Sequence, residues 1–209
     1  KRKKARMRLL ALTTLTMVAF AANSVLNRLA LAAGDMDAML FAAIRLGSGA
    51  MALALLASIG SRSGSGPGVF KPTLQPSAVI ALLVYVVGFS VAYLSLDPGF
   101  GALILFGVVQ ITMFAGAIAA REDMPITRHI GAGLAIAGLV FLLWPGNAAP
   151  VSFVHGAAMA AAGVGWGVYS LLGRSSRDPL RSTASNFLFA APVAALCWAT
   201  LGETQVTVY

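Results

Sequence analysis

Charged residues are scarce in this chain. Of its 209 residues only 11% are charged, and only seven are Asp or Glu. A soluble domain usually carries about a quarter charged residues, so the scarcity argues against a protein surrounded by water. No Asp or Glu lies inside the long apolar runs, and both histidines stand near the ends of such runs. Paired carboxylates for acid–base chemistry and an intramembrane proton-relay carboxylate are therefore missing from those runs.

Cysteine is almost absent as well. The single Cys197 excludes an intramolecular disulfide and any metal site built from several thiolates. The sequence also lacks a Gly-x-x-x-x-Gly-Lys phosphate loop and a Gly-x-Ser-x-Gly nucleophile motif. We therefore expect neither an enzyme nor a bound metal or cofactor.

What the chain has in abundance is apolar residues, which make up 58% of it and give a mean hydropathy of +0.83. They form seven runs of roughly the 20 residues that cross a bilayer, and lipid leaves helices as the form that satisfies the backbone. The runs do not show the alternation of a membrane strand. The sequence thus predicts an all-α, polytopic membrane bundle with spans at about 9–33, 38–59, 77–96, 99–120, 129–144, 153–172 and 183–201.

The N-terminus could instead be a secretory signal peptide. Its basic start is followed by an apolar stretch and by Ala19-Phe20-Ala21, a small-x-small cleavage pattern. However, the apolar run continues about a dozen residues beyond that point and reaches spanning length. We therefore interpret residues 1–8 as a basic cytoplasmic segment and the run after them as the first span.

The basic residues follow the positive-inside rule when the N-terminus is placed in the cytoplasm. The inside segments then hold Lys1, Arg2, Lys3, Lys4, Arg6, Arg8, Arg62, Lys71, Arg121, Arg128, Arg174, Arg177 and Arg181. The charged residues of the outside loops are all acidic: Asp35, Asp37, Asp97 and Glu203. This predicts a multi-pass membrane protein with its N-terminus in the cytoplasm and lipid around it. No continuous basic stripe marks a nucleic-acid surface, despite the net charge of +8.

One stretch of the sequence occurs twice. Residues 20–28 read FAANSVLNR and residues 166–174 read WGVYSLLGR, so that aromatic, small, Ser, Leu and Arg positions coincide. The first copy lies in the first span and the second copy in the sixth, five spans later. An odd offset gives the second copy the opposite orientation in the membrane. This is the sequence pattern of an inverted repeat.

Further motifs follow in the middle of the chain. Residues 85–96 read YVVGFSVAYLSL, residues 101–107 read GALILFG, Arg121-Glu122 end the fourth run, and residues 131–138 read GAGLAIAG. With the two openings around Asn23 and Trp166, these motifs resemble the EamA-type proteins of the drug/metabolite transporter superfamily. The resemblance implies ten helices in two inverted five-helix repeats. This chain would supply one full repeat, 9–146, and two helices of the second, 147–209.

Polar groups inside the spans are the candidates for a solute cavity. Arg45 lies about 10 Å below the outer end of its helix. It either attracts an anion or is a structural arginine that reaches the interface or backbone carbonyls. Arg28 lies nearer the surface, where an interfacial anchor is the favoured interpretation. Asn23 and Asn27 share one helix face and bind either a solute or a neighbouring helix.

Gln110 sits at the middle of the fourth span, where it contacts either a solute or another helix. Four aromatic residues could wall the cavity or simply pack: Tyr85, Tyr93, Trp166 and Tyr169. Two intramembrane arginines without an acid favour a neutral or anionic small-molecule solute. The resemblance to EamA-type proteins implies a transporter of the bacterial inner membrane that works by alternating access. The alternative is a non-transporting scaffold or regulatory fragment, and a homodimer is left open.

Overall fold

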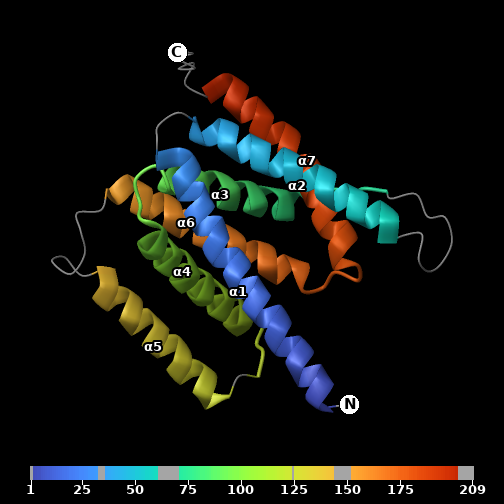
Figure 1. The fold of residues 1–209 in the computed structure, drawn as a ribbon. Helices are drawn as coiled ribbons and strands as arrows, with labels where there is room; N and C mark the ends of the chain where they lie inside the picture. The colour runs from blue at the N-terminus through green and yellow to red at the C-terminus, as the bar shows by residue number, and fades with distance from the viewer. Residues whose placement is uncertain (1, 33–35, 61–70, 124, 144–151, 202–209) are drawn as a thin grey trace.

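The computed structural model describes residues 2–32, 36–60, 71–123, 125–143 and 152–201. Within these ranges the fold is all-α, as predicted (Figure 1). Its seven helices are α1 (Arg2–Ala32), α2 (Ala38–Gly60), α3 (Pro76–Ala92), α4 (Pro98–Ala119), α5 (Ile126–Leu143), α6 (Phe153–Gly173) and α7 (Pro179–Leu201).

The helices have the composition of membrane spans. Five of them, α1, α2, α4, α6 and α7, are long and apolar enough to cross a bilayer, whereas α3 and the described part of α5 are shorter apolar helices. Large apolar side chains are exposed on all seven helices, for example Leu29 on α1 and Met51 on α2. Such a surface requires lipid rather than water around it. The chain is therefore a multi-pass membrane protein.

Successive helices run in opposite directions, so the connections gather at two ends of the bundle (Figure 1). At one end the Arg174 guanidinium pairs with Glu122 at 2.9 Å, which ties the end of α6 to the end of α4. The Thr73 backbone N–H donates to the Ser185 hydroxyl at the same end. At the other end Arg28 of α1 holds the end of α3. The arginine-rich segments thus share one end, as the charge pattern predicts.

Three helix bounds differ by four residues or more from the sequence-based expectation. α1 begins at Arg2, because the Lys and Arg residues of the basic segment are good helix formers and continue the span. α3 ends at Ala92, four residues early, where the N–H groups of Leu94 and Ser95 turn back to carbonyls of its last turn. α7 begins at Pro179, because Asp178 caps it by accepting from the Arg181 N–H at 3.1 Å.

α6 lies between α3 and α4 and is held there by glycines. A Cβ on Gly165 would stand 2.8 Å from both the Ala81 carbonyl oxygen and the Tyr85 nitrogen of α3. Gly163 and Gly167 are in the same close contact with side chains of α4. The four-residue spacing of these two glycines predicts such an approach, and the structure confirms it.

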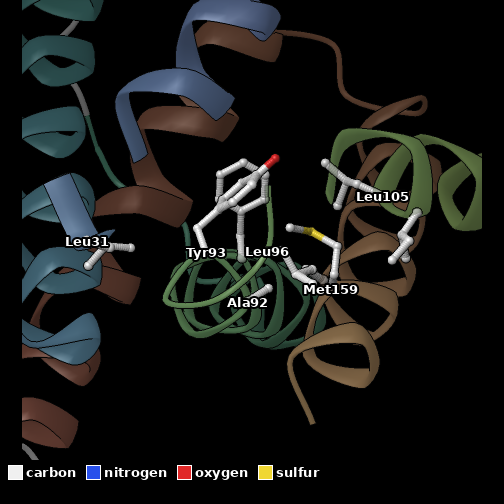
Figure 2. Packing of buried hydrophobic residues seen from close by; sticks show 9 residues of the cluster. Leu31, Ala92, Tyr93, Leu96, Leu105 and Met159 are labelled. Atoms are coloured by element: carbon white, nitrogen blue, oxygen red, sulfur yellow. The ribbon is translucent and has the colours of Figure 1, made fainter. Parts of the chain in front are cut away.

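Two apolar clusters fill the bundle. The first joins α1, α3, α4 and α6, and Figure 2 shows Tyr93 and Met159 among its buried side chains. The second joins α2, α3 and α7 through Leu46, Val86 and Ala190. Because Phe89 belongs to the first cluster and Val86 to the second, the short helix α3 connects both.

The end of α4 carries a strained residue. Arg121 adopts φ 52°, and the N–H groups of Arg121 and Glu122 donate to the carbonyls of Ile118 and Ala117. This is a Schellman ending, in which glycine is the residue without a steric penalty. We expect Arg121→Gly to raise the free energy of unfolding by about 1 kcal/mol, measured by thermal unfolding in detergent. Arg121→Ala keeps the strain and serves as the control, so a glycine variant no more stable than the alanine variant would contradict the assignment.

Candidate functional site

A half-buried arginine stands at the centre of the polar residues inside the bundle. Arg45 is the eighth residue of α2, and its Nη2 donates to the Asn23 Oδ1 of α1 over 3.4 Å. Its Nη1 is buried and has no hydrogen-bond partner among the described residues. The Tyr85 hydroxyl of α3 interacts with both Arg45 and Asn23. The Arg45 Cζ also lies 5.1 Å from the centre of the Phe89 ring.

Arg45 is held inside the bundle without an opposite charge among the described helices. An arginine at the middle of a membrane helix costs about 2.5–3.5 kcal/mol on insertion scales, somewhat less towards the interface. Cation–π contacts with the rings of Phe41 and Phe89 return about 0.5–2 kcal/mol each, and the single hydrogen bond to Asn23 is long. None of the seven helices carries an Asp or Glu to neutralise the charge. The charge is therefore offset by ring contacts and one long hydrogen bond rather than by an ion pair.

Aromatic rings continue the site away from Arg45. Tyr85 packs on Trp166 of α6 with ring centres 5.1 Å apart, and Trp166 in turn meets Phe20 of α1 edge-on at 5.1 Å. Phe106 of α4 contacts both Phe20 and Trp166. These rings form an apolar wall beside the polar groups. We call Asn23, Arg45, Tyr85, Phe89 and Trp166 the Arg45 cluster.

Asn23 and Asn27 share a helix face, as predicted, and bond to each other. The Asn27 Nδ2 donates to the Asn23 carbonyl oxygen at 2.6 Å and to its Oδ1 at 3.1 Å. The buried Asn27 Oδ1 has no partner among the described residues. Asn27 thus orients Asn23 from one turn away, and Asn23 makes the contact with the neighbouring helix.

Arg28 and Tyr93 have structural roles in this fold. The Arg28 Nη1 donates to the carbonyl oxygens of Tyr93 at 3.0 Å and Leu94 at 2.7 Å, which satisfies the C-terminal end of α3. Tyr93 is completely buried, and its hydroxyl donates to the Pro98 carbonyl at 3.2 Å. Both side chains hold the turn between α3 and α4 in place.

Gln110 and Tyr169 lie away from the Arg45 cluster. Gln110 is exposed and lines a cavity of about 320 Å³ between α4 and α5. Tyr169 borders a small cavity of about 50 Å³ at the arginine-rich end, together with Gln75, Ser182 and Asn186. The nine candidate residues therefore divide among several places. Asn23, Arg45, Tyr85 and Trp166 come together, with Asn27 behind Asn23, and the Tyr93 ring joins them by packing edge-on against Phe89 at 4.7 Å.

Sequence reasoning missed two kinds of residue. Phe20, Phe89 and Phe106 were indistinguishable from other apolar side chains until the helices were placed. Asn186 is 3% exposed, and its Nδ2 donates to the Tyr169 hydroxyl over 3.4 Å. A signal for it existed, because Asn186 follows Asp178 by the same eight residues that separate Arg45 from Asp37.

Comparison with known proteins gives one informative similarity. The chain is 44% identical over 191 residues to a Pseudomonas aeruginosa protein, "Uncharacterized protein PA1977". The match covers 90% of this chain and 64% of the relative, so the chain spans somewhat less than two thirds of the length of that relative. No protein-family model matches the chain, and no solved structure matches it.

Proposed function

We propose that this chain forms the solute pathway of an EamA-type transporter, which moves a small neutral or anionic solute across the bacterial inner membrane by alternating access. The observation that carries the proposal is a repeated arrangement of α1–α2 and α6–α7. Transporters built from inverted repeats place their solute site where the repeats meet. We assign such a position to the Arg45 cluster, whose residues come from α1, α2, α3 and α6.

The similarity that supports a repeat is clearest in α2 and α7. Both helices are 23 residues long, and each follows its preceding helix after a link of five residues. Asp37 caps α2 by accepting from the Leu40 N–H at 2.9 Å, and Asp178 caps α7 through the N–H at the equivalent position. The eighth residues, Arg45 and Asn186, are the polar groups of the two helices that reach the preceding helix.

The partners of these two residues are equivalent as well. Asn23 and Tyr169 are the fourth residues of the repeated stretch, and each contacts the eighth residue of the next helix over 3.4 Å. Phe20 and Trp166 are its first residues, and their rings pack against each other. The two copies of the stretch lie at different distances from the C-terminal end of their helix, because α1 continues past Arg28 whereas α6 ends just before Arg174.

The two arrangements point in opposite directions. α2 and α7 pack closely, and Figure 1 shows them crossing with their starts at different ends of the bundle. An axis in the membrane plane would relate such a pair. The Arg45 cluster then lies towards the outer side and the Tyr169–Asn186 pair towards the cytoplasm. The positive-inside rule gives this orientation, with the N-terminus in the cytoplasm.

The longer relative fits the same plan. Because 191 aligned residues are 64% of it, the relative is about 300 residues long, which leaves room for three further helices. α6 packs against both α3 and α4, whereas α1 is mostly exposed. In a ten-helix protein the counterparts of α3 and α4 would cover α1. We propose that arrangement for the complete transporter.

Flux through liposomes tests the proposal. We expect the protein and its longer relative, reconstituted with a panel of radiolabelled amino acids and organic acids, to move at least one solute faster than protein-free liposomes. Arg45→Ala should reduce that flux by roughly tenfold or more, because the pathway loses its only intramembrane charge besides Arg28.

Arg177→Ala is the matched control, since it removes an exposed arginine from the link between α6 and α7. It should leave flux unchanged, and both variants should insert to the same level. If neither protein moves any solute of the panel although both are inserted and folded, the scaffold alternative replaces the transporter.

A further inference from the structure

We propose that the Arg45 cluster binds the carboxylate group of an organic acid, so that the solute is a carboxylate rather than a neutral or cationic molecule. This inference rests on the proposed transport function and specifies the chemistry of its solute. It is carried by the unmatched donors of Arg45 and by the neighbours that surround them.

Arg45 has more hydrogen-bond donors than its surroundings use. A guanidinium presents five N–H donors and accepts none. Arg45 makes one hydrogen bond to a described side chain, the long bond from Nη2 to Asn23, and it also interacts with the Tyr85 hydroxyl, whereas the buried Nη1 has no partner in the part of the chain that the structure describes. Arg28 contrasts with it, because its Nη1 alone reaches two carbonyl oxygens. Arg45 therefore lacks the acceptors that a structural arginine finds.

The missing acceptor must come from outside the described helices. No acidic side chain lies on any of them, and the rings of Phe41 and Phe89 supply attraction for a cation but no lone pair for an N–H. Arg45 is half buried as a residue, so part of its side chain remains accessible, although Nη1 itself is enclosed by the described helices. An incoming anion would complete both the charge and the hydrogen bonds of the guanidinium.

Geometry favours a carboxylate among the anions. Two parallel N–H groups of a guanidinium, its fork, match the two oxygens of a planar carboxylate. A single-atom anion such as chloride offers one acceptor atom to both N–H groups. The Tyr85 hydroxyl and the Asn23 amide stand beside the guanidinium and can bond further polar atoms of the same ligand. Trp166 and Phe20 keep the region behind Tyr85 apolar, which strengthens the charge interaction.

Trp166 provides the readout for a binding test. The chain has three tryptophans, so Trp144→Phe with Trp198→Phe leaves Trp166, whose ring lies 5.1 Å from that of Tyr85, as the sole reporter. The protein is placed in phosphatidylcholine nanodiscs and titrated with acetate and benzoate. Acetamide and benzamide are the uncharged counterparts of nearly the same shape. We expect a saturable change in Trp166 fluorescence with the acids and none with the amides.

Arg45→Gln should weaken acid binding by roughly tenfold to a hundredfold, the range for hydrogen bonds to a charged group. Arg45→Lys keeps the charge without the fork and should still lose roughly tenfold. Arg177→Gln, at an exposed position, should bind as the parent does. Thermal unfolding of each variant confirms that it is folded before titration.

Three results would overturn the proposal: amides that bind as well as the acids, unchanged affinity in folded Arg45→Gln, or chloride that competes as strongly as acetate. Repeating the titration in nanodiscs with phosphatidylglycerol separates solute from lipid, since loss of acetate binding there would assign the site to an anionic headgroup. Acetate binding without flux would refute transport alone. Flux of a neutral solute without acid binding would refute the carboxylate site alone.

Discussion

Gly165→Leu is expected to prevent the bundle from assembling. A Cβ at this position would stand 2.8 Å from the Ala81 carbonyl oxygen and 2.8 Å from the Tyr85 nitrogen. Both atoms belong to the backbone of α3, so no side-chain rotation relieves the contact and the two helices must separate. Even Gly165→Ala should lower the free energy of unfolding by about 1–3 kcal/mol, and leucine should cost more. The measurement is thermal unfolding in detergent, followed by size-exclusion elution.

Gly131→Ala is the matched control for this prediction. Gly131 lies on α5, and a Cβ there would meet no described atom within 4 Å. Alanine should leave stability unchanged or raise it by up to about 1 kcal/mol through helix propensity. If Gly165→Ala were as stable as Gly131→Ala, the close approach of α3 and α6 would be wrong. The same shift would displace Tyr85, so Gly165→Ala should also weaken carboxylate binding at the Arg45 cluster.

Arg45→Met should give a more stable protein without transport. Methionine fills a similar volume without charge, and replacing a poorly compensated buried charge by an apolar side chain gains about 1–3 kcal/mol. Flux and acid binding should fall to background in the same variant. A residue that lowers stability while serving function is expected to show this opposite pair of effects. Thermal unfolding and liposome flux on the same preparation measure both.

Arg28→Met is the comparison for Arg45→Met, because Arg28 is a structural arginine whose loss should lower stability rather than raise it. The substitution removes the two hydrogen bonds from Arg28 Nη1 to the Tyr93 and Leu94 carbonyls, which leaves the end of α3 unsatisfied. We expect a loss of about 2 kcal/mol. If Arg45→Met were also destabilised to that extent, Arg45 would be a structural residue and the proposed site would lose its central group.

Much of the fold could be predicted from the sequence, because a segment that crosses lipid must be apolar and long enough to span the bilayer. Apolar runs of spanning length predicted all seven helices, and the placement of Lys and Arg predicted which connections share an end. The bounds were less accurate where local hydrogen bonds decide them. The early end of α3 depends on the turn after Ala92, and the early start of α7 depends on the Asp178 cap. Neither interaction changes the hydropathy of the sequence.

The sequence by itself determined that this chain is a helical membrane protein and which few polar residues lie inside it, since an intramembrane arginine stands out against an apolar background. Only the tertiary structure decided their roles. It gave Arg28 two carbonyl acceptors and left Arg45 with a single long bond, and it placed Gln110 on the face of α4 that borders α5. The composition of a segment decides whether it lies in lipid or in water, and that information is local in the sequence. The hydrogen-bond partners of a side chain come from other helices, so they depend on how those helices pack.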